Sequence, residues 1–283
     1  MRAPMMARSV GRPLKLGLFY AVLSALGASF LLPYVLAAFA SLKPINEIFS
    51  QAAWVPPTSL YLHNYANALN NYGFLTAFEN TVLVTCALTV GQVTFGVLAA
   101  YAFARMRFPG RDGVFWVYLM TLMIPNAVTL IPLFTIMRYA HLLNTYWAIF
   151  LPYALGVPYS IFLMRQFFLS IPQHLLDAAR IDGCSEIGIL RRVIIPMSRP
   201  VIITATLIAF VFGWNNFLWP LIVTNSTNKY VLTIAIAEVA GGYGTRWDVV
   251  LTGGMIALIP LLVLFAVFQR QIIRSVQLTG SVK

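Results

Sequence analysis

The chain has 283 residues, of which 60% are hydrophobic and only 10% are charged, and its mean hydropathy is +0.80. A soluble domain of this length has too little interior to bury so much apolar surface, so the composition excludes an ordinary water-soluble fold. The net charge of +11 would suggest nucleic-acid binding in a soluble protein, but here the basic residues lie in short segments between long uncharged runs. We therefore expect membrane lipid around the chain and no nucleic-acid partner.

Six apolar runs follow one another along the chain, and each reaches the roughly 20 residues that a helix needs to cross a bilayer. Lipid offers the backbone no hydrogen-bond partner, so such runs predict helices and not open sheet. We expect an all-α integral membrane protein, with one domain over residues 1–283 and one cytoplasmic loop at 170–199. The six spans are predicted at about 16–42, 80–104, 113–137, 143–165, 200–223 and 249–269.

Lysine and arginine predict the orientation, because they are retained on the cytoplasmic side during insertion. With the N-terminus inside, only four of the 19 basic residues face outward, namely Lys43, Arg138, Lys229 and Arg246. The opposite orientation would reverse this ratio. Both termini are therefore predicted to be cytoplasmic, and so is the loop 170–199.

The sequence does not indicate that this chain itself hydrolyses nucleotide, binds a metal ion or catalyses a reaction. The sequence contains no Gly-Lys dipeptide, so the phosphate-binding loop of nucleotide hydrolases is absent. The three histidines, His63, His141 and His174, have no ligand spacing and no nearby cluster of cysteine or carboxylate, which argues against a metal site. We expect no enzyme activity, no catalytic residue and no cofactor bound by this chain.

The loop 170–199 concentrates charge that the rest of the chain lacks. Its pattern predicts two short helices separated by Gly183, which permits the left-handed turn that ends a helix. Ser170 and Ser185 are candidate N-caps. In the second helix, the residues expected on one apolar side are Ile187, Leu190 and Ile194.

Two readings of this loop are open from the residues alone. Ala178 and Ala179 would let another protein approach closely, and neighbouring Asp177 and Arg180 could fix its register by charge-assisted hydrogen bonds. Alternatively, the helix pair rests on lipid headgroups, which its arginines would favour.

The loop also resembles the EAA motif, E-A-A-x3-G-x9-I-x-L-P, of permease subunits of binding-protein-dependent ABC importers. The spacing matches at every step through Asp177-Ala178-Ala179, Gly183, Val193 and Ile195-Pro196. Asp replaces Glu, Val replaces Ile and Ile replaces Leu. The side chain of Asp177 is shorter than the Glu of the motif, which alters the distance of its carboxylate from a basic partner. Among the roles that the resemblance implies, a salt bridge at Asp177 is therefore the one that it supports least.

Further segments extend the resemblance over nearly the whole chain, to the maltose-transporter second-permease type of the carbohydrate importers. They are Ser41-Leu42-Lys43-Pro44, Trp54-Val55-Pro56, Tyr101-Ala102-Phe103-Ala104-Arg105, Phe108-Pro109-Gly110, Met123-Ile124-Pro125, Trp214-Asn215-Asn216-Phe217 and Trp219-Pro220-Leu221. Each is weak alone, but their order makes the resemblance specific.

The resemblance implies a type I ABC importer fold in a bacterial inner membrane, and a sugar or sugar-like solute. It also implies a second, different permease subunit, two cytoplasmic ATPase subunits that bind ATP and magnesium, and an extracytoplasmic solute-binding protein. The loop would then be the coupling helix seated in an ATPase cleft. The residues given this coupling role are Asp177, Ala178, Ala179, Arg180, Asp182, Gly183, Val193, Ile195 and Pro196.

Polar or aromatic residues inside the spans are candidates for the solute path, because sugars bind through hydroxyl hydrogen bonds and aromatic stacking. They are Asn80, Gln92, Asn126, Trp214, Asn215 and Asn216. The alternative is that these side chains join helices through interhelical hydrogen bonds. No Asp or Glu lies near a span's centre, which disfavours an ion-driven carrier. That carrier and a non-transporting scaffold subunit remain the alternative functions, and the solute itself is not predicted.

Overall fold

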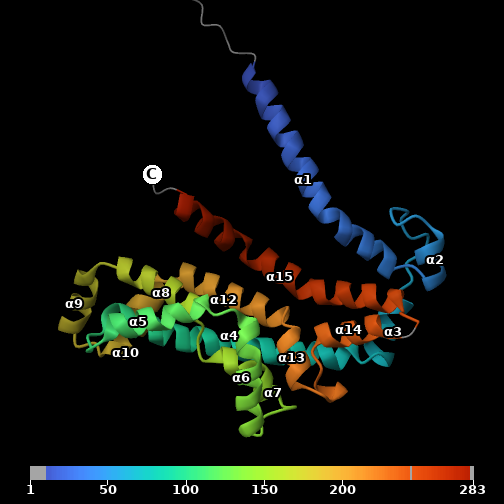
Figure 1. The fold of residues 1–283 in the computed structure, drawn as a ribbon. Coiled ribbons are helices and arrows are strands. Elements are labelled where there is room, and N and C mark those ends of the chain that lie inside the picture. Colours follow the sequence, from blue (N-terminus) through green and yellow to red (C-terminus); the bar gives the residue numbers. More distant parts are fainter. Residues whose placement is uncertain (1–10, 243, 281–283) are drawn as a thin grey trace, which may run out of the picture.

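The computed structural model describes residues 11–242 and 244–280, and within these ranges the chain is helical with no strand (Figure 1). The helices are α1 (Gly11–Ser41), α2 (Ile45–Ser50), α3 (His63–Asn71), α4 (Phe74–Arg105), α5 (Arg111–Met120), α6 (Asn126–Tyr139), α7 (Tyr146–Ala154), α8 (Pro158–Ser170), α9 (Gln173–Ile181), α10 (Glu186–Ile189), α11 (Ile195–Met197), α12 (Arg199–Trp214), α13 (Leu218–Val223), α14 (Leu232–Gly241) and α15 (Trp247–Gly280). Short turns of 3-10 helix at Thr121–Met123 and Thr227–Lys229, and a π-helical turn at Leu190–Ile194, complete the order.

Four stretches of the described chain are long and apolar enough to cross a membrane, and two bent pairs of helices raise the number to as many as six. The four stretches are Leu16–Ser41, Phe74–Arg105, Tyr146–Ser170 and Trp247–Gln269. The second of them, α4, begins six residues before the predicted start at Asn80. The third combines α7 and α8 across a break at Gly156, where φ is +105°.

The run predicted as a span at 113–137 is not one straight helix. The chain bends by 106° between the segments Arg111–Met123 and Asn126–Tyr139. Pro125 lies at the break, and proline both lacks a backbone N–H and disfavours helical geometry in the residue before it. Hydrophobicity alone does not reveal such a bend, since both halves are equally apolar. The other bent pair joins Glu186–Met197 to α12 at 83°.

Helix α4 lies at the centre of the bundle and packs against α7, α8 and α12. Two glycines permit this close approach. A Cβ at Gly91 would lie 2.8 Å from the Ala154 Cβ, and one at Gly96 would lie 2.6 Å from the Met164 Cε. Close helix contact through small residues is how membrane helices gain packing when lipid supplies no hydrophobic driving force.

Three buried clusters form the core. The first joins the C-terminal half of α4 to α8, α9, α10 and the start of α12, with Tyr101, Phe168 and Leu176 among its members. The second joins α4, α7, α13 and α14, and the third joins α3, α4, α14 and α15. The loop 170–199 therefore belongs to the same packed body as one end of the bundle.

Helix α1 diverges from the rest of the bundle along most of its length (Figure 1). Its most apolar stretch has no buried residue. Its C-terminal end is fixed, because the Asn64 side-chain amide donates to the carbonyls of Ser41 and Lys43 at 3.0 and 2.8 Å. Ser41 Oγ also bonds to the Tyr65 hydroxyl at 2.9 Å. One end of α1 is thus attached to α3 while its apolar sides are left uncovered.

Candidate functional site

The loop 170–199 turns at Gly183, whose φ of +79° confirms the predicted left-handed residue. The Asp182 N–H donates to the Ala178 carbonyl at 2.9 Å, and the Cys184 N–H donates to the Ala179 carbonyl at 2.9 Å. These bonds satisfy carbonyls that the end of α9 would otherwise leave unpaired. The glycine thereby ends α9 and aims the chain into α10.

Of the two predicted caps, one is confirmed and one is wrong. Ser185 Oγ accepts a hydrogen bond from the Gly188 N–H at 3.2 Å at the start of α10. Ser170 instead ends α8, where its hydroxyl donates to the Phe167 carbonyl at 2.7 Å. The N-cap position of α9 is Pro172, which has no side-chain acceptor to offer.

The buried face of the loop differs from the predicted one. Leu190 and Ile194 are buried as expected, but Ile187 is 68% exposed and Ile189 takes its place in the core. The cause is the π-helical turn at Leu190–Ile194, in which the Ile195 N–H bonds to the Leu190 carbonyl. A π turn holds more residues than an α turn, so it rotates Ile194 toward the side of Ile189 and away from Ile187.

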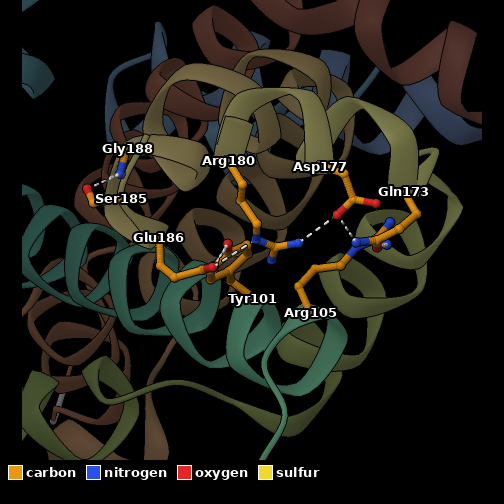
Figure 2. A network of polar contacts seen from close by, with 8 residues as sticks. All are labelled: Tyr101, Arg105, Gln173, Asp177, Arg180, Ser185, Glu186 and Gly188. Carbon is orange, nitrogen blue, oxygen red and sulfur yellow. Dashed lines mark hydrogen bonds and ion pairs between the residues drawn. The ribbon is translucent and has the colours of Figure 1, made fainter. Parts of the chain in front are cut away.

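A continuous set of polar contacts attaches this loop to the C-terminal end of α4 (Figure 2). We call it the polar brace, and its members are Tyr101, Arg105, Gln173, Asp177, Arg180 and Glu186. At its centre, the Arg180 guanidinium donates to Glu186 Oε1 at 3.2 Å and to Asp177 Oδ1 at 2.9 Å. The hydrogen bond to Glu186 is the main cause that raises the pKa of Arg180.

Both ends of the polar brace reach α4. Tyr101 Oη donates to Glu186 Oε2 at 2.5 Å. Arg105 Nη1 donates to Gln173 Oε1 at 2.9 Å, and Gln173 Nε2 donates to Asp177 Oδ1 at 3.0 Å. Arg105 also donates to the carbonyls of Phe168 and Ile171 at the end of α8. The brace therefore connects α4, α8, α9 and α10.

The nine predicted coupling residues differ in their surroundings, and one of them, Gly183, lies at the turn described above. Asp177 and Arg180 are used inside the chain by the polar brace, whereas Ala178 and Asp182 are exposed. Ala179 is buried in the first core cluster, and Val193 and Ile195 pack partly against it. Pro196 is exposed in α11 beyond the π-helical turn. Tyr101, Arg105, Gln173 and Glu186 were not predicted as site residues, although Arg105 directly follows the predicted span 80–104 on the same side of the membrane as the loop.

Three of the predicted path residues have polar side-chain atoms engaged between helices, and the first two are Asn80 and Trp214. Asn80 Oδ1 accepts from the Tyr146 hydroxyl at 2.8 Å, and its amide donates to the carbonyls of Asn228 and Tyr230 at 3.0 and 2.9 Å. Trp214 is 3% exposed, and its indole N–H donates to the Ala257 carbonyl at 2.9 Å. Both contacts are of the helix-joining kind.

The four remaining path candidates differ in exposure and in surroundings. Asn126 is exposed at the start of α6, and Asn215 is exposed on the wall of a cavity of about 670 Å³ between α1 and α15. Asn216 is half-buried, and its carbonyl accepts from the Thr233 hydroxyl at 2.9 Å. Gln92 is the third helix-joining residue, since it is buried on α4 and its amide donates to Ser160 Oγ of α8 at 3.0 Å. The structure does not bring the six candidates into one site within this chain.

Comparison with known proteins gives one consistent family. Residues 92–278 match the family described as binding-protein-dependent transport system inner membrane component. The arabinooligosaccharides transport system permease protein AraQ of Halalkalibacterium halodurans is 34% identical over 251 residues, which cover 88% of this chain and 90% of that protein. The sn-glycerol-3-phosphate transport system permease protein UgpE of Pectobacterium atrosepticum is 30% identical, over 82% of each chain.

A solved structure shares the fold over nearly the full length. A chain of a bacterial ABC transporter involved in the import of the acidic polysaccharide alginate superposes with a TM-score of 0.83, at 24% identity, over 95% of this chain and 99% of that one. The architecture of Figure 1 is thus that of an ABC importer permease. With its multiple apolar helices and its family match, this chain belongs to the binding-protein-dependent transport system inner membrane components, and it is a transport subunit and not an enzyme.

Proposed function

We propose that this chain forms half of the translocation path of an ATP-driven importer for a sugar or sugar-like solute. The support is the family, together with the solutes that the relatives' names give: arabinooligosaccharides for one and sn-glycerol-3-phosphate for another. A transporter of this fold imports alginate, an acidic polysaccharide. Hydroxyl-rich solutes are common to these proteins.

The observation that carries the proposal is the attachment of the loop 170–199 to the bundle. The loop shares a buried core with α4, α8 and α12, and the polar brace adds contacts from α9 and α10 to α4. A close-packed core transmits displacement because it cannot deform continuously. When two cytoplasmic ATPase subunits close on ATP, a loop seated in one of them would carry these helices with it as a rigid body.

Nucleotide chemistry belongs to the partner chains in this proposal. ATP and magnesium bind the ATPase subunits, and ATP acts by its different affinity for the two arrangements of the complex. This chain binds no cofactor. Its part is to convert closure of the ATPase pair into a change between inward-open and outward-open spans.

The second half of the path comes from a different permease subunit. Asn126 and Asn215 are exposed in the single chain, so they are available to a solute that passes between two permeases. Asn80 and Trp214 would instead join helices, because Asn80 bonds to Tyr146 of α7 and Trp214 bonds to Ala257 of α15. Helix α1, with its uncovered apolar sides, is suited to contact that second permease as well as lipid.

Orientation follows the basic residues. We place both termini and the loop 170–199 in the cytoplasm and the segments around α2 and α14 outside. The outer segments would receive a solute-binding protein. A structure of an alginate transporter in complex with an alginate-bound periplasmic protein, with a TM-score of 0.63, supports that arrangement by analogy of fold.

Reconstitution tests the function directly. The chain, its partner permease and the ATPase subunits are placed in lipid vesicles with ATP inside, and uptake of radiolabelled oligosaccharides is measured with the binding protein outside. Uptake that needs ATP and survives collapse of ion gradients is expected. Uptake that follows an ion gradient without ATP would identify a secondary carrier, and a complex without uptake of any sugar would identify a scaffold.

A further inference from the structure

A cavity of about 360 Å³ lies at the N-terminal end of α4, where the turn after α3, the 3-10 turn Thr227–Lys229 and α14 meet. Figure 1 shows α3 and α14 together at that end of the bundle, far from α9 and α10. The polar and aromatic residues that line the cavity are Tyr72, Thr76, Thr227, Asn228, Tyr230 and Glu238. The cavity has the size of a small-molecule site, and three separate parts of the chain contribute to it.

The wall that contains the 3-10 turn is fixed to the bundle. The Tyr230 N–H donates to the Thr227 carbonyl at 3.2 Å and closes the turn. Just beyond it, the Leu232 N–H donates to the buried Thr81 Oγ1 of α4 at 2.8 Å, and Leu232 itself is 1% exposed. These bonds use backbone groups of the wall, so its side chains remain available on a preorganised frame.

The fold does not use the polar side chains around the cavity. Four of them are exposed and form no side-chain hydrogen bond or ion pair with a described residue, namely Thr76, Thr227, Asn228 and Glu238. Asn228 is bonded through its backbone carbonyl. By contrast, the Thr81 hydroxyl, on the same helix as Thr76, donates to the carbonyl one turn earlier at 2.7 Å. The unused groups therefore gather at the cavity.

Their chemistry matches that of a sugar ring. Two threonine hydroxyls, one amide and one carboxylate can donate to and accept from ring hydroxyl groups. Hydrogen bonds to the carboxylate of Glu238 are charge-assisted and therefore the strongest of these. The half-buried Tyr72 and Tyr230 add aromatic rings to the same lining, and such rings present a large apolar surface to the C–H groups of a sugar.

Charge distinguishes a neutral sugar from an acidic one. Glu238 is the only charged side chain of the described residues that lines the cavity. The nearby cations are engaged elsewhere: Arg246 bonds to the buried Asp248 at 2.9 and 2.6 Å, and the Lys229 ammonium lies 4.6 Å from the centre of the Tyr146 ring. A carboxylate or phosphate on the solute would therefore meet a like charge with no cation to offset it.

We infer that this cavity binds one neutral sugar ring of the solute at the outer end of the chain, with Glu238 and Asn228 bonded to its hydroxyl groups. The inference rests on the proposed function and names a class of solute for it. The solutes named for two of the compared proteins, sn-glycerol-3-phosphate and alginate, are acidic, so the inference separates this chain from those proteins in solute charge.

Direct sugar binding tests the cavity. The full assembly is reconstituted without the solute-binding protein, and saturation-transfer NMR measures binding of two matched pairs, galactose with galacturonate and glucose with glucuronate. The neutral member of a pair should bind more tightly than its acid. Glu238→Gln should weaken neutral binding about tenfold and reduce the preference over the acid, since it removes a charge-assisted bond and the repulsion together. Asn228→Ala should weaken neutral binding severalfold. Glu79→Gln, which changes an exposed carboxylate of α4 outside the lining, is the matched control and should change neither.

Cysteine labelling locates the bound sugar. In a chain in which Cys86 and Cys184 are replaced by serine, Thr76→Cys reacts with a small maleimide from the cavity. The neutral sugar that binds should slow this reaction severalfold, and its acid should not. Thr58→Cys, at an exposed threonine of the segment between α2 and α3, should react at the same rate with and without sugar.

Three results would overturn the inference. The first is equal binding of the neutral and acidic members of both pairs. The second is sugar binding that Glu238→Gln and Asn228→Ala leave unchanged, which would place the sugar elsewhere in the assembly. The third is no binding of any of the four sugars, and weaker attachment of the solute-binding protein to the same variants would then assign the cavity to that protein. Failure of the proposed function is separate, because an unaltered assembly that accumulates no sugar with ATP and the binding protein would reject it even where the cavity binds sugar.

Discussion

Tyr101 Oη donates a 2.5 Å hydrogen bond to Glu186 Oε2 across 85 positions of the sequence. Tyr101 is 4% exposed and lies in the last part of α4, whereas Glu186 begins α10. The bond therefore joins the central helix of the bundle to the second half of the loop 170–199. Together with Arg105 at the other end of the polar brace, it gives the loop two points of attachment to α4.

Removal of that hydroxyl should weaken the attachment without a loss of packing. Tyr101→Phe keeps the ring in the core but takes one partner from Glu186, at an expected loss of about 1 kcal/mol in the free energy of unfolding. ATP-driven uptake should fall more than ATP hydrolysis, because loop movement is passed less completely to α4. Both rates are measured in vesicles, and Tyr159→Phe, in a half-exposed ring, is the control. Equal uptake by the two variants would contradict a role for this bond.

Substitutions at Gly183 are expected to act through the backbone conformation and not through steric contact. A Cβ at this position would meet nothing within 4 Å, yet φ is +79°. Gly183→Val should lower coupled uptake strongly, since left-handed geometry costs an ordinary residue about 1–2 kcal/mol and is worse for a branched one. Gly183→Asn should be much milder, because asparagine tolerates this conformation.

Gly113→Val is the matched control for the Gly183 variants, since a Cβ there also meets nothing within 4 Å and no positive φ is involved. It should retain uptake. The expected order of uptake is therefore Gly113→Val above Gly183→Asn above Gly183→Val. If Gly183→Asn and Gly183→Val failed to the same extent, the left-handed turn would not be the reason that glycine is needed there.

Gly91 and Gly96 give a prediction about packing on α4. A Cβ at Gly91 would approach both the Cβ and the backbone oxygen of Ala154, at 2.8 and 2.9 Å, so backbone must move. A Cβ at Gly96 would meet only the end of the flexible Met164 side chain. Gly91→Ala should therefore destabilise by about 1–3 kcal/mol and Gly96→Ala by less. Thermal unfolding in detergent measures the order, and the reverse order would show that the α4–α7 contact is not the tighter one.

The sequence was informative where physics acts locally. Apolar length predicted helices, and Gly183 and Ser185 predicted the turn and the cap at which α10 begins. Features that depend on distant parts of the chain were not predicted. The π-helical turn exchanged Ile187 for Ile189 in the core, and nothing in the local pattern reveals such a turn.

The polar brace shows the same limit at the functional site. Asp177 was expected to be available to a partner, although its bond to Arg180, three residues further along α9, is of the local kind that helical spacing favours. Its partner Gln173 is four residues away, but Gln173 is itself held by Arg105 from another helix. Only the fold brings the end of α4 against α9, so the sequence could propose the loop but not its attachment.

Substitutions at Asn80 and Asn215 distinguish the two roles proposed for polar residues in the spans, which are helix joining and contact with the solute. Asn80 makes three hydrogen bonds to Tyr146, Asn228 and Tyr230. Asn80→Ala would leave those groups without partners, and the loss should be about 1–3 kcal/mol of stability, which shows as a lower temperature of unfolding and less folded protein in the membrane. The solute concentration that half-saturates uptake should not change in the protein that remains folded.

Asn215 should behave in the opposite way. Its side chain is exposed and its amide bonds only to the Val211 carbonyl of its own helix, at 2.9 Å, so its removal costs the fold little. If the solute passes this face, Asn215→Ala should raise the half-saturating solute concentration or slow uptake severalfold while the unfolding temperature stays within a degree or two of the unaltered chain. Stability and uptake measured on both variants form a two-by-two test. A stable Asn215→Ala chain with unaltered uptake would remove Asn215 from the path, because an exposed amide with neither a structural nor a transport effect has no part in either function.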